Sequence, residues 1–101
     1  MLKIKMGKIA DLPPGKSLEK RILAKRIAVF NIEGKLYGIE ADCKHMKASL
    51  AQGEVIDGIL TCRWHGWRYD LASGDCLTQP GMKLKKYDIL VDGDDVFVHF
   101  P

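Results

Sequence analysis

The stretch TCRWHGWRYD, residues 61–70, gathers side chains that bind metals and side chains that exclude water. It holds one of the three cysteines, one of the three histidines and both tryptophans of the chain. Cysteine thiolates and histidine imidazoles are common protein ligands of transition metals. The stretch therefore indicates a metal site. The fold class that holds this site is indicated by the strands predicted on both sides of the stretch.

The residues before and after this stretch alternate as β-strands do. Leu2, Ile4 and Met6 alternate with lysines at the start of the chain, which predicts a half-buried strand. Loops are predicted where prolines or glycines interrupt the pattern, as at residues 11–15 and at Glu33-Gly34. Helix signals are weak, and the best candidate is a turn or two at 47–52. The further strands predicted by these patterns cover residues 17–23, 26–32, 35–39, 84–91 and 96–100.

Length and composition indicate one domain spanning residues 1–101, the alternating patterns make it all-β, and the segment at about residues 41–80 looks like an inserted subdomain. The 101 residues suit a single core, and 47% hydrophobic and 29% charged residues are globular values. The apolar runs are too short to cross a bilayer and the start lacks a signal-peptide block, so we expect a cytoplasmic protein. A net charge of +3 is too slight to indicate nucleic-acid binding.

The candidate ligands form two pairs, Cys43-x-His45 and Cys62-x-x-His65, separated by sixteen residues. Three cysteines in a chain without an export signal do not suggest a disulfide framework, so metal binding is their leading use. A single tetrahedral zinc fits two cysteines and two histidines, although cysteine usually pairs with cysteine in such sites. A two-iron cluster fits the alternating order better, because thiolates can hold one iron and imidazoles the other.

These motifs and their spacing resemble the Rieske [2Fe-2S] family, in its low-potential branch of ferredoxins that serve oxygenases. The segment CRWHGWRYDLASG, residues 62–74, is similar to the family's second cluster loop, including Gly66 and Tyr69. Leu50, Gly53 and Pro80 also fall where the family's loops turn. The resemblance implies an antiparallel β-sandwich that holds one [2Fe-2S] cluster per chain, with Cys43 and Cys62 on the buried iron and His45 and His65 on the outer iron.

The sequence departs from the Rieske proteins of quinol-oxidising complexes at positions that matter for the cluster. Where those proteins have two disulfide cysteines and a serine, this chain has Ala48, Trp64 and Trp67. A missing hydroxyl donor leaves the charge of a reduced cluster less stabilised, which lowers its potential. We expect a potential near the bottom of the Rieske range, about −150 mV.

Several neighbouring residues have a structural interpretation beside a functional one. We expect Trp64 and Trp67 to form an apolar wall, and Tyr69 either to pack beside the cluster or to donate its hydroxyl to a ligand. Cys76 is interpreted as a buried thiol acting as a small hydrophobe, and His99 as a surface or strand-edge residue. A cationic rim, formed by Lys44, Lys47, Arg63 and Arg68, is expected either to steer an acidic partner or to be an ordinary solvated surface.

Three functions remain open. The first is a monomeric one-electron carrier that passes electrons from a flavin-dependent or other reductase to a terminal oxygenase. The second is a small subunit of a larger reductase, resembling that of assimilatory nitrite reductase, and the third is a structural zinc module. An oxygenase is excluded because the 36 residues after His65 and the single further histidine cannot build a non-haem iron domain.

Overall fold

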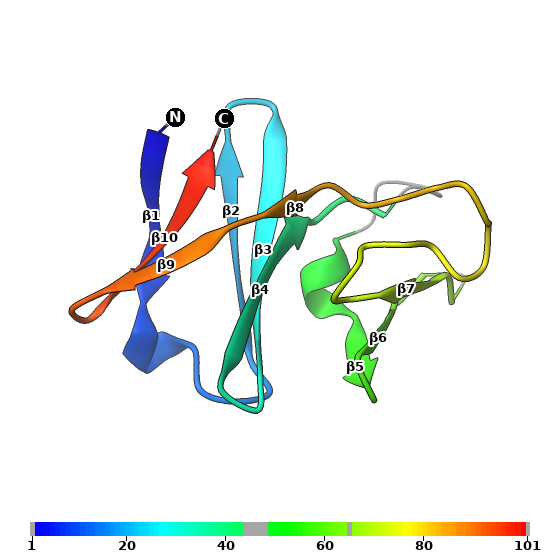
Figure 1. The fold of residues 1–101 in the computed structure, drawn as a ribbon, viewed down its shortest axis with the longest axis horizontal. Helices are drawn as coiled ribbons and strands as arrows, with labels where there is room; N and C mark the ends of the chain where they lie inside the picture. The colour runs from blue at the N-terminus through cyan, green and yellow to red at the C-terminus, as the bar shows by residue number, and fades with distance from the viewer. Residues whose placement is uncertain (1, 44–48, 65, 101) are drawn as a thin grey trace.

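The computed structural model describes residues 2–43, 49–64 and 66–100, and within these ranges the strands form three antiparallel sheets (Figure 1). The first sheet has the order β1 (Leu2–Lys8), β10 (Asp95–Phe100), β9 (Ile89–Asp92). The central sheet has the order β2 (Ser17–Ile22), β3 (Lys25–Ile32), β4 (Lys35–Glu40), β8 (Lys86–Tyr87). The small sheet has the order β5 (Glu54–Ile56), β6 (Ile59–Thr61), β7 (Arg68–Asp70). Two 3₁₀ turns, η1 (Ile9–Asp11) and η2 (Leu50–Gln52), complete the described elements.

The central sheet is covered on both faces, and strand β3 shows why. Its side chains alternate between faces, as in any strand. Ile27 and Val29 lie in the core shared with the first sheet, whereas Ala28 and Phe30 lie in the core shared with the small sheet. All four are buried, which explains why this strand reads as a continuous apolar run. The predicted all-β antiparallel sandwich is thereby confirmed, and the small sheet forms an additional layer.

The small sheet packs against the central sheet through a core in which large side chains meet closely. Leu50, Leu60, Tyr69 and Leu71 are at most 2% exposed and belong to the same cluster as Phe30. The strands of this sheet lie within the segment 41–80, but their alternation is too short for the sequence pattern to have predicted them. Each has three residues.

The single strand predicted at 84–91 is instead two strands, β8 and β9, in different sheets. Tyr87 pairs with Gly38 of β4, whereas Ile89 pairs with Val98 of β10. The chain therefore passes from the central sheet to the first sheet at Asp88, a crossing visible in Figure 1. The alternation of apolar residues continues through the crossing, so the pattern alone did not reveal it.

The other predicted strands are found with shifts of one or two residues at their ends. The hairpin between β3 and β4 turns at Glu33 and Gly34, both of which have positive φ angles. Of the helical piece predicted at 47–52, the described part is the 3₁₀ turn η2, and residues 47 and 48 lie outside the described ranges. The described part of the chain contains no helix that is long and apolar enough to span a membrane.

Candidate metal centre

Two loops, each closed by a backbone hydrogen bond, carry the predicted cysteines. In the first loop, the Leu50 N–H donates to the Ala41 carbonyl at 2.6 Å. In the second, which follows β6, the Cys62 N–H donates to the Trp67 carbonyl at 2.7 Å. Gly66 has a φ of +69° in the second loop, a conformation that glycine adopts readily. In each loop the two ends are therefore adjacent, at Ala41 and Leu50 in the first and at Cys62 and Trp67 in the second. A metal site built from two short segments requires such closed loops.

A close backbone approach holds the first loop against the small sheet. A Cβ atom on Gly53 would lie 2.5 Å from the Thr61 carbonyl oxygen and 2.9 Å from Leu60. Thr61 immediately precedes Cys62, so glycine at residue 53 brings the end of the first loop next to the start of the second. This contact gives a physical reason for the glycine that the family resemblance singled out.

The thiols of Cys43 and Cys62 are brought together in the protein interior. Each residue is 1% exposed, and both are free cysteines. Burial raises the pKa of the Cys62 thiol, a hydrogen bond with the Trp64 backbone opposes that rise, and the hydrogen-bonded Cys43 side chain adds to it. Two adjacent buried thiols are costly to ionise without a cation, and bound iron supplies the charge that favours thiolates. The pair therefore fits one iron of a cluster.

His45 and His65, the other two predicted ligands, lie outside the described residues. Of the predicted ligand set, the described structure accordingly brings together the two cysteines. In the sequence, His45 and His65 follow Cys43 and Cys62 by two and three residues.

Tyr69 belongs to the site through a direct contact with a candidate ligand. Its hydroxyl lies 3.2 Å from Cys43 Sγ, within hydrogen-bonding distance for sulfur, and its side chain is fully buried. Strand pairing of Tyr69 with Leu60 on β6 fixes the position of the ring. Of the two roles left open for Tyr69, the structure shows both a hydroxyl contact with the candidate ligand Cys43 and a ring packed in the core cluster that contains both cysteines. Beside a thiolate, which can only accept, the phenol O–H donates a hydrogen bond to the sulfur.

The two tryptophans differ in burial. Trp67 is half-buried and packs against the core cluster that contains both cysteines. Trp64 is 56% exposed, so it does not pack into this core as Trp67 does. That both tryptophans form an apolar wall beside a cluster stays a prediction.

A third segment, residues 76–82, braces strand β7 beside the second loop. The Arg68 N–H donates to the Thr78 hydroxyl at 2.9 Å, and the Leu77 N–H donates to the Arg68 carbonyl at 2.8 Å. Pro80 is exposed in this segment. Thr78 was not singled out from the sequence, because a single threonine in a loop gives no signal of its bonding partner.

Cys76 and His99 are the cysteine and histidine outside the predicted ligand set. Cys76 is 4% exposed, accepts a hydrogen bond from the Gln79 N–H at 3.3 Å and belongs to the core, which confirms its interpretation as a small buried thiol. His99 is half-buried on β10, the central strand of the first sheet. Of the two positions expected for His99, the strand edge is not observed, because β1 and β9 flank its strand, whereas its partial exposure agrees with the surface alternative.

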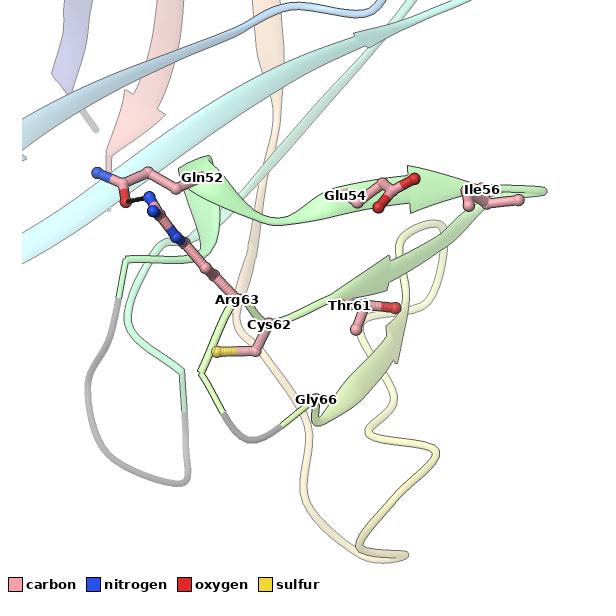
Figure 2. A pocket seen from close by; sticks show the side chains of 7 residues that line it. All are labelled: Gln52, Glu54, Ile56, Thr61, Cys62, Arg63 and Gly66. Atoms are coloured by element: carbon pink, nitrogen blue, oxygen red, sulfur yellow. Dashed lines mark hydrogen bonds between the residues drawn. The ribbon is translucent and has the colours of Figure 1, made fainter.

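A surface cavity of about 480 Å³ lies beside the second loop. Figure 2 shows Arg63 reaching from this loop to Gln52 of η2, where its Nη1 donates to the amide oxygen at 3.1 Å. The sulfur of Cys62 points away from Glu54 and Ile56 of β5 (Figure 2). The lining residues are Gln52, Glu54, Ile56, Thr61, Cys62, Arg63 and Gly66.

Sequence comparison assigns this site to a family. Residues 3–88 match the Rieske [2Fe-2S] domain. The chain is 31% identical over 94 residues to the biphenyl dioxygenase ferredoxin subunit of Pseudomonas sp. (strain KKS102), covering 91% of this chain and 86% of that protein. It is 34% identical over 96 residues to the 3-phenylpropionate/cinnamic acid dioxygenase ferredoxin subunit of Escherichia coli (strain K12), covering 92% and 89%.

Structural comparison finds the same fold in solved proteins. The Sphingomonas yanoikuyae B1 ferredoxin matches with a TM-score of 0.87 at 24% identity, covering 99% of this chain and 100% of the other. A protein described as the small subunit of an NADPH nitrite reductase matches with a TM-score of 0.82, also at 24% identity, covering 99% and 100%.

The sandwich and the paired thiols between two loops define an all-β iron–sulfur protein. The chain belongs to the Rieske [2Fe-2S] domain family, and one [2Fe-2S] cluster is the cofactor of that domain. The identification first made from the two Cys/His motifs is confirmed at the level of family and fold.

Proposed function

We propose that this protein is a one-electron carrier that passes electrons from a reductase to a terminal oxygenase. The observation that carries the proposal is the buried pair of thiols, Cys43 and Cys62, in a Rieske domain whose curated relatives are dioxygenase ferredoxin subunits. This chain covers most of the length of those relatives, which are named as ferredoxin subunits. We therefore propose that this protein is an electron-transfer component and not an enzyme in its own right.

The proposed ligand set is Cys43 and Cys62 on the inner iron and His45 and His65 on the outer iron. The buried thiols support the first half, and the motif spacing supports the second. In this arrangement the two loops belong to a cluster-binding subdomain, at about residues 41–80, of a single domain. When bound, the cluster accepts and releases one electron.

The residues around the cluster then set its reduction potential. Tyr69 donates a hydrogen bond to Cys43 Sγ and the Trp64 backbone donates one to Cys62, and both favour the more negative, reduced state. Trp67 stands where quinol-oxidising Rieske proteins have a serine, so that position offers no hydroxyl. We propose a potential near the low end of the Rieske range, about −150 mV.

The proposed partners are a flavin-dependent or other reductase as donor and a terminal oxygenase as acceptor. A ferredoxin of the same fold has been solved in complex with the oxygenase of carbazole 1,9a-dioxygenase, with a TM-score of 0.85. Arg63 and Arg68 of this chain are exposed next to the second loop, which supports a cationic rim that steers an acidic partner surface. A carrier of this kind works as a cytoplasmic monomer, without membrane or nucleic acid.

A second function, the small subunit of a nitrite reductase, is favoured by one observation, the structural match to a protein described in that way. Gel filtration of an extract from the native host separates the two functions. A free carrier elutes as a single chain, whereas a subunit elutes with a large flavoprotein.

An anaerobic titration with dithionite tests the carrier function itself. We expect the visible absorbance of the purified protein to bleach after uptake of one electron per chain and to recover on reoxidation. The reduced protein should then lose its electron to an oxidised Rieske oxygenase in a stopped-flow mixing experiment. A protein that takes up no electron and contains zinc would overturn the proposal.

A further inference from the structure

We propose that Arg26 is a positioning residue that holds the first ligand loop against the central sheet. The proposal rests on the function proposed above, because it takes this loop as one that binds the cluster. Arg26 lies on β3, outside the metal-binding motifs. Its guanidinium connects the loop to the sheet through two carboxylates.

The first connection is to the residue beside a proposed ligand. Nη2 of Arg26 lies 2.8 Å from Asp42 Oδ1, and Asp42 is the chain neighbour of Cys43. The backbone adds a second link at the same place, because the Ala41 N–H donates to the Arg26 carbonyl at 2.7 Å. A shift of Asp42 would therefore move Cys43 and its sulfur.

The second connection reaches the other end of the loop through Glu19 of β2. Nη1 of Arg26 lies 3.5 Å from Glu19 Oε1, and that same oxygen accepts a hydrogen bond from the Ser49 hydroxyl at 2.7 Å. Asp42 and Ser49 form an antiparallel bridge across the base of the loop. Arg26 and Glu19 thus contact both sides of the base of this loop, at Asp42 and at Ser49.

Strand register explains why these side chains reach the loop. Glu19 pairs with Ala28 across β2 and β3, and Arg21 pairs with Arg26, so these four residues project from one face. Ala28 lies in the core shared with the small sheet, which identifies the face as the one toward the ligand loops. Ser17, two residues before Glu19 on that face, donates to the Ala51 carbonyl at 2.9 Å and extends the contact.

Arginine suits this role better than lysine. Its planar fork presents separate N–H groups to two carboxylates, whereas an ammonium is a single point of charge. The side chains of Arg26, Glu19 and Asp42 are 27%, 30% and 31% exposed, so the network is partly shielded from water. A partly shielded network constrains geometry more than an isolated surface pair does.

The test compares the variants Arg26→Gln and Asp42→Asn with the matched control Arg21→Gln. Arg21 lies directly opposite Arg26 on the same face, is exposed, and shows no ion pair within the described ranges. All measurements use holoprotein: the rate of cluster loss in excess chelator, followed by visible absorbance, and the g values of the dithionite-reduced protein. Wild type must first show a Rieske signal, and a wild type without one would contradict the proposed function, not the role of Arg26.

We expect Arg26→Gln and Asp42→Asn each to lose the cluster about three- to five-fold faster than wild type. Their g values should shift, because Cys43 is displaced, whereas Arg21→Gln should match wild type in both measurements. The double variant should lose the cluster no faster than the worse single variant, since Arg26→Gln alone already breaks the link to Asp42 that Asp42→Asn breaks. Arg26→Lys should recover part of the difference.

Equal rates of cluster loss and equal g values in Arg26→Gln and Arg21→Gln would overturn the proposal. Any change would then come from the lost positive charge and not from the contacts of Arg26. Should Arg26→Gln yield no holoprotein, Asp42→Asn decides the matter. This variant keeps the sheet intact and breaks the link from the loop side. Wild-type kinetics and g values in Asp42→Asn would overturn the role assigned to Arg26.

Discussion

The hydroxyl of Tyr69 lies 3.2 Å from Sγ of Cys43, and both side chains are buried. A hydrogen bond to a ligand sulfur stabilises the extra negative charge of a reduced cluster. We therefore expect Tyr69→Phe to lower the reduction potential by about 50 mV, close to a tenfold change for a one-electron couple. Protein-film voltammetry measures the shift directly.

Tyr37→Phe is the matched control for Tyr69→Phe. Tyr37 is half-buried and packs against the same core cluster, but from strand β4 and with its ring under Lys35. Its variant should retain the wild-type potential. An equal shift in both variants would mean that the potential responds to core packing and not to the hydroxyl of Tyr69.

Cysteine substitutions should separate ligands from the remaining buried thiol. We expect Cys43→Ser and Cys62→Ser to abolish or strongly reduce the bound cluster, because thiolate is the ligand that iron–sulfur clusters require. Cys76→Ala should keep a full cluster and lose only about 1 kcal/mol of stability, since Cys76 packs as a small hydrophobe. Iron and sulfide assays on the purified variants check this. Cluster loss in Cys76→Ala would show that the ligand set is wrong.

Two glycines with similar backbone angles should differ in their tolerance of alanine. Gly74 and Gly81 have φ angles of +85° and +95°, so both variants carry a backbone cost of about 1–2 kcal/mol. A Cβ on Gly74 would also lie 2.6 Å from the Leu84 carbonyl oxygen, whereas a Cβ on Gly81 would meet nothing within 4 Å. Gly74→Ala should therefore be the less stable variant in thermal unfolding. Equal midpoints would mean that Leu84 moves aside at no cost.

Stability at alkaline pH should depend on Tyr87. Burial, and secondly the Glu40 carboxylate, raise the pKa of Tyr87 above its ordinary value. The folded state then holds its proton more tightly than the unfolded state, so stability is fully present below the unfolded pKa of about 10 and falls as pH rises through the folded pKa. Tyr87→Phe should weaken this dependence, as measured by urea unfolding between pH 8 and 11.

The same variant should be tolerated near neutral pH. The buried Tyr87 hydroxyl has no hydrogen-bond partner in the described part of the chain, so its removal exposes no orphaned partner there. We expect a change of less than about 1 kcal/mol in the free energy of unfolding at pH 7. A large loss at pH 7, or an unchanged alkaline slope, would contradict the role assigned to burial.

Much of the fold could be predicted from local alternation, because alternation reflects which strand faces are buried. β2, β3 and β4 lie close to their predicted bounds, and the turn at Glu33-Gly34 has the expected backbone. The break between β8 and β9 was missed since Tyr87 and Ile89 alternate normally while pairing with different sheets. Strands of three residues, as in the small sheet, are too short to show a period.

The candidate site could be predicted in part, because ligand motifs keep their spacing in the sequence. Cys43 and Cys62 were chosen from that spacing, and the structure brings their thiols together. Side-chain contacts between residues far apart in the chain leave no recognisable spacing in the sequence. Arg26 is seven residues from Glu19 and sixteen from Asp42, and only strand pairing shows that one guanidinium reaches both.

The central claim, that the chain holds a Rieske [2Fe-2S] cluster between its two loops, is tested most directly by electron paramagnetic resonance of the dithionite-reduced protein. Iron and sulfide are assayed on the same sample. We predict a rhombic Rieske signal accounting for one spin per chain, with two irons and two sulfides. A colourless protein that gives no signal and contains one zinc per chain would contradict the claim.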